Sequence, residues 1–80
     1  MGTSLDTLKE MLDIAVALEP NNREITIHND GEYVMVTRIV KKLNSADLTK
    51  EQIVQVMTEK ASQYPEFDFS YMENGVFKSN

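Results

Sequence analysis

The sequence predicts an α+β domain in the order α-β-β-α-β-β, with two helices on one face of a mostly antiparallel four-stranded sheet. Three observations support this prediction. Apolar residues recur at helical spacing over residues 4–18 and 49–63. Strand-forming residues dominate residues 32–43, the longest such run in the chain. Residues 29–31 and 73–75 carry the asparagine and glycine pattern of hairpin turns.

Residues 4–18 form the first predicted helix. Ser4 or Thr3 can cap its N-terminus, and Asp6 suits the positive end of the helix dipole. Its apolar residues span an arc of about 200° on a helical wheel, which is wider than one face of a sheet usually covers. We therefore expect this helix either to be deeply buried or to meet another chain. Pro20 ends it.

The first hairpin leads into the predicted central strand, residues 32–43. Strand 24–28 alternates. The loop that follows could contain two residues or three, and the choice reverses the register; we favour three, at 29–31, with Gly31 in a left-handed conformation. This register places one set of apolar side chains on the core face, namely Ile25, Ile27, Tyr33, Met35 and Ile39. Residues 32–43 are apolar on both sides, so this strand should lie inside the sheet. Three valines would then lie on an open second face: Val34, Val36 and Val40.

The second half repeats the order helix, proline, hairpin. Thr49 and Gln52 form a capping box that starts a helix over 49–63, and Pro65 stops it. A strand with aromatic residues at period two follows, and a three-residue turn at 73–75 leads to strand 76–78, with Phe77 beside Tyr71. Gene duplication and ordinary helix–hairpin punctuation explain this likeness equally well. The predicted buried residues are Leu8, Leu12, Val16, Ile25, Ile27, Val36, Ile53, Met57, Phe69 and Phe77, with Met11, Met35 and Met57 as core methionines.

Composition limits the classes of function. Residues 1–80 suffice for a single small domain, and the absence of cysteine excludes disulfides and thiolate metal sites. No apolar run is long enough to span a bilayer and no signal peptide is present, so we expect no membrane partner and a cytoplasmic location. The sequence has no glycine-rich phosphate loop and no metal-ligand spacing, and it predicts no metal site and no cofactor.

No catalytic residue is predicted. The single histidine, His28, is the only natural candidate for acid–base chemistry at neutral pH, and it falls on the outward face of a strand beside a turn. The serines lie in capping, helical or terminal positions. We therefore expect His28 to be an ordinary surface histidine, and the protein not to be an enzyme.

Two charged sets are candidate partner-binding residues. The basic set is Arg38, Lys41 and Lys42, and the acidic set is Asp6, Glu10 and Asp13. The expected function is that of a small regulator or adaptor that binds a protein partner, with a homodimer as a further hypothesis. Small acidic domains of this type are frequent among phage and mobile-element proteins, which suggests a viral origin by association only.

The alternative function is association with nucleic acid, through residues 38–42 or by acidic mimicry of a phosphate backbone. The formal charge of −5 argues against general nucleic-acid binding.

Overall fold

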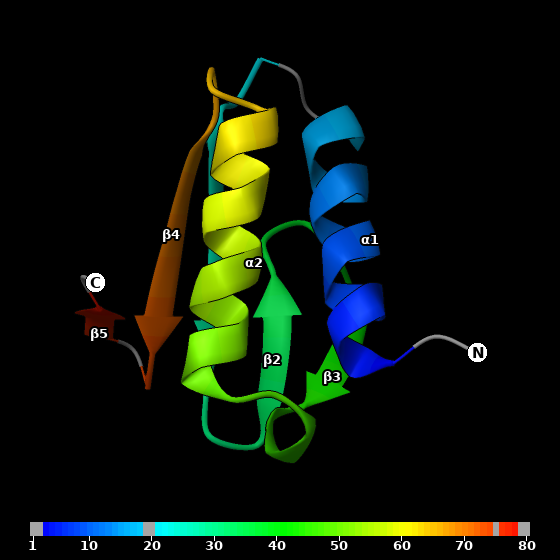
Figure 1. Cartoon of the computed structure of the whole chain (residues 1–80), viewed down its shortest axis with the longest axis vertical. Coiled ribbons are helices and arrows are strands. Elements are labelled where there is room, and N and C mark those ends of the chain that lie inside the picture. Colours follow the sequence, from blue (N-terminus) through cyan, green and yellow to red (C-terminus); the bar gives the residue numbers. More distant parts are fainter. Residues whose placement is uncertain (1–2, 19–20, 75, 79–80) are drawn as a thin grey trace.

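A computed structural model describes residues 3–18, 21–74 and 76–78, the last three by their backbone alone. Figure 1 shows the elements in chain order. They are α1 (Ser4–Leu18), β1 (Glu24–Asn29), β2 (Tyr33–Val36), β3 (Lys42–Asn44), the short 3₁₀ helix η1 (Ser45–Asp47), α2 (Lys50–Gln63), β4 (Asp68–Glu73) and β5 (Val76–Lys78).

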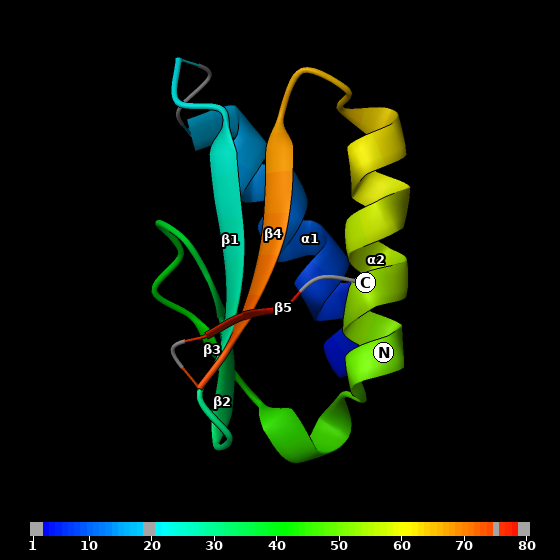
Figure 2. The ribbon, with the colours of Figure 1, turned by 90° about the vertical axis from the view of Figure 1, so that its left-hand side faces the viewer.

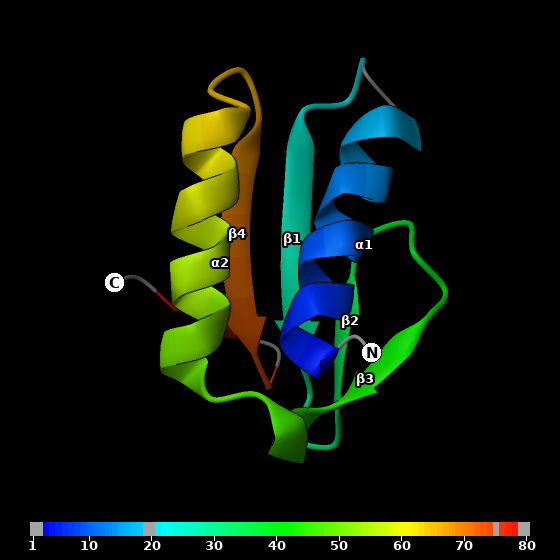
Figure 3. The same cartoon turned by 45° about the vertical axis from the view of Figure 1, so that its right-hand side comes forward.

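The strands form one mixed sheet in the order β3-β2-β1-β4-β5. The central pair β1 and β4 is parallel, and the other three pairs are antiparallel. Helices α1 and α2 lie side by side over the same face of this sheet (Figures 1 and 3). α1 packs on β1, β2 and β3, whereas α2 packs on β4. The predicted fold class is therefore confirmed, with a fifth strand added.

Both helices begin at the caps that the sequence indicates. The Thr3 hydroxyl accepts from the Asp6 backbone N–H at 3.2 Å, and the Asp6 carboxylate accepts from the Thr3 N–H at 3.3 Å. Thr49 and Gln52 make the predicted reciprocal pair at the start of α2, with distances of 3.1 and 2.9 Å. Each pair satisfies N–H groups that the first helical turn leaves without partners.

The first hairpin has a different register from the predicted one. Asn29 pairs with Val34, whereas a loop at 29–31 would pair His28 with Glu32, and Gly31 has the predicted positive φ, at 94°. The predicted loop at 29–31 is therefore wrong, since residues 30–32 join β1 to β2. The register differs from the predicted one by an odd number of positions, which moves every side chain of β2 to the opposite face. Val34 and Val36 therefore face the core, while Tyr33 and Met35 lie on the other side.

The predicted strand 32–43 is interrupted. Thr37 N still donates to Thr26 O at 2.9 Å, but Arg38 has a φ of 75°, and Ile39 N donates back to Val36 O at 2.9 Å. The chain thus turns at residues 37–41 and returns as β3, antiparallel to β2. β2 does lie inside the sheet, but β1 is its central strand. Val40, predicted on the open face, lies in this loop with 92% of its surface exposed.

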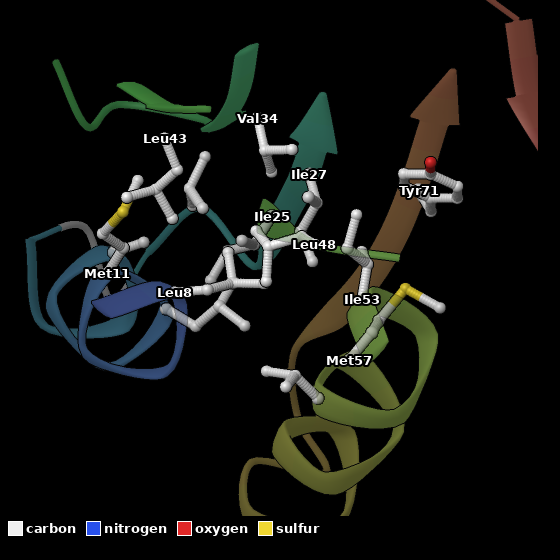
Figure 4. Packing of buried hydrophobic residues seen from close by; sticks show 14 of the residues in the cluster. Leu8, Met11, Ile25, Ile27, Val34, Leu43, Leu48, Ile53, Met57 and Tyr71 are labelled. Carbon is white, nitrogen blue, oxygen red and sulfur yellow. The ribbon is translucent and has the colours of Figure 1, made fainter. Parts of the chain in front are cut away.

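The core fills the space between the two helices and the sheet (Figure 4). Of the predicted buried residues, Val16 and Phe69 are only partly buried, and the side chain of Phe77 lies outside the described part of the structure. Met35 is not a core methionine, because the observed register turns it away. The buried apolar set is Leu8, Met11, Leu12, Ala15, Ile25, Ile27, Val34, Val36, Leu43, Leu48, Ile53, Val56, Met57, Phe67 and Tyr71.

The second hairpin also departs from the predicted register. Glu73 pairs with Val76, and Met72 pairs with Phe77. A three-residue loop at 73–75 and a pairing of Phe77 with Tyr71 are therefore wrong. Asn74 has a φ of 51°, a left-handed conformation that asparagine tolerates better than most residues.

A polar cluster joins the two helices. The Lys60 amine lies 2.8 Å from Asp13 Oδ1 and 3.1 Å from Gln63 Oε1, and the Tyr64 hydroxyl donates to the same Asp13 oxygen at 2.9 Å. Lys60 is 5% exposed, so without these partners the burial of its amine would be costly. The hydrogen bond to Asp13 raises the pKa of the Tyr64 hydroxyl, because ionised tyrosine could no longer donate it.

Candidate functional site

The candidate site lies on the sheet face opposite the helices, called here the open face. Its side chains come from alternate residues of β1, β2, β3 and β4. The registers place Lys42, Met35, His28 and Met72 in one row across these four strands, and Phe77 of β5 occupies the next backbone position. Figure 2 shows the sheet edge-on, with both helices on one side of it.

A hollow of about 370 Å³ opens around the middle of this row. The loop 37–41 lies on the same side of the sheet, away from the helices (Figure 2). The hollow therefore has strand side chains and loop residues in its wall. Its lining residues are His28, Asn29, Asp30, Met35, Val36, Ile39 and Met72.

His28 is half-buried and lies between two methionines. Its register partners are Met35 on β2 and Met72 on β4, and all three side chains line the hollow. The ring Nε2 lies 3.4 Å from the Thr37 hydroxyl. The predicted outward position beside a turn is thus confirmed, and the structure adds that His28 lines the hollow.

The two other polar lining residues are engaged in the hairpin. Asp30 Oδ1 accepts from the backbone N–H groups of Glu32 at 2.8 Å and Tyr33 at 2.7 Å. The bonds from Tyr33 and Glu32 hold the pKa of Asp30 below its ordinary value, since they stabilise the carboxylate. Asn29 Oδ1 accepts from Gly31 N at 3.0 Å. Both residues thus line the hollow with groups that already hold the hairpin together.

The predicted basic set does not form a single cluster. The Arg38 guanidinium donates from Nη2 to the Glu24 carbonyl at 3.1 Å, so it joins the loop to the start of β1. The Lys42 amine lies 5.4 Å from the centre of the Tyr33 ring, as in a cation–π contact. Lys41 is exposed in the loop. Only Lys42 belongs to the row through the hollow.

The three residues of the predicted acidic set share one side of α1 but differ in their contacts. Asp6 takes part in the cap of α1, and Asp13 holds Lys60 and Tyr64. Glu10 is exposed on α1. Two of the three carboxylates thus have structural contacts, and charge reversal at either would disturb the fold as well as any partner surface.

Met35 and Met72 are the site residues that sequence reasoning missed. Met35 was assigned to the core, because the register predicted for the first hairpin was wrong. Met72 alternates with Tyr71, which is 1% exposed, so period-two patterning of β4 could have placed it on the open face.

A second feature that was not predicted is a hydrogen-bonded chain on the other side of the sheet. Asn29 Nδ2 donates to the Tyr71 hydroxyl at 3.2 Å, and this hydroxyl donates to Glu73 Oε2 at 2.9 Å. Burial raises the pKa of Tyr71, and the Glu73 carboxylate raises it further, whereas the bond from Asn29 lowers it. The chain ties the carboxyl ends of β1 and β4 together.

Helix α1 leaves part of its wide apolar arc uncovered in the described structure. Ile14 is 49% exposed and Leu18 is 55% exposed, while Leu8, Met11, Leu12 and Ala15 are buried. These two side chains are one helical turn apart, so they lie on the same side of the helix. They form a second, smaller apolar surface.

No family model, curated protein or solved structure matches this chain. Among the described helices, none combines the length and the apolar character needed to cross a membrane. Within the same residues, no three histidine, aspartate or glutamate side chains gather as a potential metal site.

Proposed function

We propose that this protein is a non-catalytic binding domain whose contact surface is the open face of its sheet. The proposed partner is a protein that inserts an apolar side chain between Met35 and Met72 and offers a carboxylate to Lys42. The observation that carries this proposal is the hollow itself, which lies on the face away from both helices and has methionine on two neighbouring sides of His28.

Methionine supports this choice of partner. Its unbranched, polarisable side chain adapts to different apolar shapes, and it is enriched on binding surfaces for this reason. Met35 and Met72 are half-buried and line the hollow, so part of each side chain is accessible to a partner.

Charge supports the proposed carboxylate. Lys42 is exposed and lies beside Met35 in the same row, at the edge of the hollow. The nearest lining carboxylate, Asp30, has its Oδ1 atom bonded to two backbone N–H groups. An acidic group on the partner would therefore find a cation on this side of the hollow.

The chain contains no cysteine, which fits a reducing compartment, and the proposed place of action is the cytoplasm. A second copy of the chain is the competing occupant of this face. The two occupants differ in one measurable respect, since a homodimer forms in the purified protein and a heterologous complex does not.

The test is capture from an extract of the native source, followed by mapping on the purified complex. Met35→Glu and Met72→Glu each place a charge in the hollow and should weaken binding by about 30-fold, the effect of a central contact residue. Gln55→Glu adds the same charge on the exposed surface of α2 and should leave binding unchanged. Far-ultraviolet circular dichroism and thermal unfolding establish that all three variants fold.

The complex should also protect backbone amides of residues 26–28, 34–35 and 70–72 from hydrogen exchange. The open face is not the contact surface if both methionine variants still capture the partner, or if Gln55→Glu is the one variant that loses binding. A retained species that is removed by nuclease would instead support the nucleic-acid alternative.

A further inference from the structure

We propose that His28, Met35 and Met72 form a binding site for a soft monovalent metal ion, Cu(I), with Ag(I) as its close chemical analogue. The site would use one imidazole nitrogen and two thioether sulfurs. It goes beyond the proposed protein contact and does not depend on it, because the ion would bind to the isolated chain.

The sheet register brings the three donors together. His28 is the direct partner of Met35 in the antiparallel pair β1–β2 and of Met72 in the parallel pair β1–β4. Residues directly opposite each other on neighbouring strands place their side chains on the same face, with β-carbons about 5 Å apart. All three side chains line the same hollow.

The donor types select the class of ion. Thioether sulfur is a soft ligand that suits Cu(I), and imidazole binds copper well. All three donors are neutral when they coordinate, so they do not compensate the charge of the bound ion. An uncompensated single charge costs less free energy in a partly buried site than a double charge, which favours a monovalent ion. Hard cations such as Ca²⁺ and Mg²⁺ prefer oxygen ligands and would not select this set.

The neighbours of His28 orient it for this role. The Thr37 hydroxyl donates its own proton to the Thr26 carbonyl at 2.9 Å and accepts from the Thr26 N–H at 3.0 Å. With its proton directed to Thr26, this oxygen would accept at His28 Nε2, 3.4 Å away, in the tautomer that carries its proton there. The proton of the neutral imidazole then lies on Nε2, and the lone pair of Nδ1 is left for the metal. Metal-bound histidines commonly donate their second N–H in this way.

Several polar groups near the hollow already have partners. Asp30 Oδ1 and Asn29 Oδ1 accept backbone hydrogen bonds of the hairpin. The Lys42 amine, which would repel a cation, lies over the Tyr33 ring instead. Asp30 Oδ2 is a hard oxygen donor, so a soft ion would prefer the thioether and imidazole donors to it.

The direct experiment is a titration of the full chain with silver nitrate in chloride-free buffer, followed through the methyl resonances of ¹³C-labelled methionine. The chain has five methionines, which provide internal controls. At one equivalent of Ag(I) the resonances of Met35 and Met72 should shift, and those of the buried Met11 and Met57 should not. The His28 ring resonances should shift at the same point, and an equal concentration of Zn²⁺ should leave all of them in place.

Affinity is then measured for Cu(I) held by bicinchoninic acid as a competing chelator. Met35→Leu, Met72→Leu and His28→Ala should each lower it by about tenfold or more, because each removes a ligand. Met57→Leu keeps a similar side-chain volume at a site across the core and should bind within about twofold of the wild type. Leucine is close in size to methionine, so these variants test the sulfur rather than the packing.

The proposal is overturned if Met35 and Met72 stay unshifted at one equivalent of Ag(I), or if the wild-type signals move only at Met1. It is equally overturned if Met35→Leu and Met72→Leu bind Cu(I) as the wild type does. The titration needs no variant, so a variant that failed to fold would leave the central result decisive.

Discussion

Replacing Asp13 by alanine should destabilise the protein by about 2 kcal/mol, although Asp13 is a helix residue that is close to half exposed. The reason lies in its partner. The side chain of Lys60 is 7% exposed and that of Asp13 is 45% exposed, and their ion pair spans the two helices at 2.8 Å. Without Asp13, the Lys60 amine keeps only Gln63 as a hydrogen-bond acceptor among the contacts described above.

The magnitude follows from three contributions. A hydrogen bond to a charged group is worth about 1.5–3 kcal/mol, and the Tyr64 bond to the same carboxylate adds about 1 kcal/mol. The higher helix propensity of alanine returns about 0.5 kcal/mol. Removing one member of a fully buried pair costs about 3–5 kcal/mol, but the exposure of Asp13 lets water reach the amine. The expected total of about 2 kcal/mol lowers Tm by about 8–16 °C in a chain of this size.

The assay is urea unfolding followed by circular dichroism. Glu10→Ala is the matched control, since it removes the same charge from an exposed site of the same helix and should stay within about 0.5 kcal/mol of the wild type. Adding Lys60→Met to Asp13→Ala removes the stranded amine and should recover about 1 kcal/mol. A loss below about 0.5 kcal/mol for Asp13→Ala, with no recovery in the double variant, would show that the pair behaves as an ordinary surface pair.

Four further predictions concern local structure, ionisation and association. Thr49→Ala removes the acceptor for the Gln52 N–H and should cost about 1 kcal/mol by the same urea assay, whereas Thr49→Ser should restore most of it. Gly31→Ala introduces a side chain at a φ of 94° and should cost about 1 kcal/mol; an unchanged stability would contradict that turn. The hydrogen bond to Asp13 raises the pKa of Tyr64 in the folded state. The contribution of this bond to the free energy of unfolding is therefore fully present below pH 10 and is lost as pH rises through the raised pKa. Absorbance at high pH should show this tyrosine ionising earlier after Asp13→Ala, and an unchanged titration would contradict the assigned hydrogen bond. Sedimentation equilibrium at micromolar concentration should reveal a dimer if a second copy covers an apolar surface, and a 9.1 kDa monomer throughout would rule this out.

The candidate site could be predicted only in part. Its single histidine was visible at once, and its place on the outward face of β1 followed from alternation with Ile25 and Ile27. Met35 could not be added, because its face depends on how many residues lie between the paired positions of the first hairpin. An odd change in register exchanges the two faces of a strand, and the short-range turn signal at residues 29–31 does not fix that number. Met72 was missed, although alternation with the buried Tyr71 could have placed it on the open face.

The sequence by itself determined the features that depend on near neighbours in the chain. Helix 4–18 and the Thr49 cap were correct to the residue, because capping and helical periodicity act over three or four positions. The tertiary structure decided what depends on distant residues. The turn at Arg38, the parallel pairing of β1 with β4 and the row that joins His28 to both methionines arise only when separate segments pack. Burial selects among registers that local signals leave nearly equal, and here it placed Val34 and Val36 in the core and left Met35 at the surface.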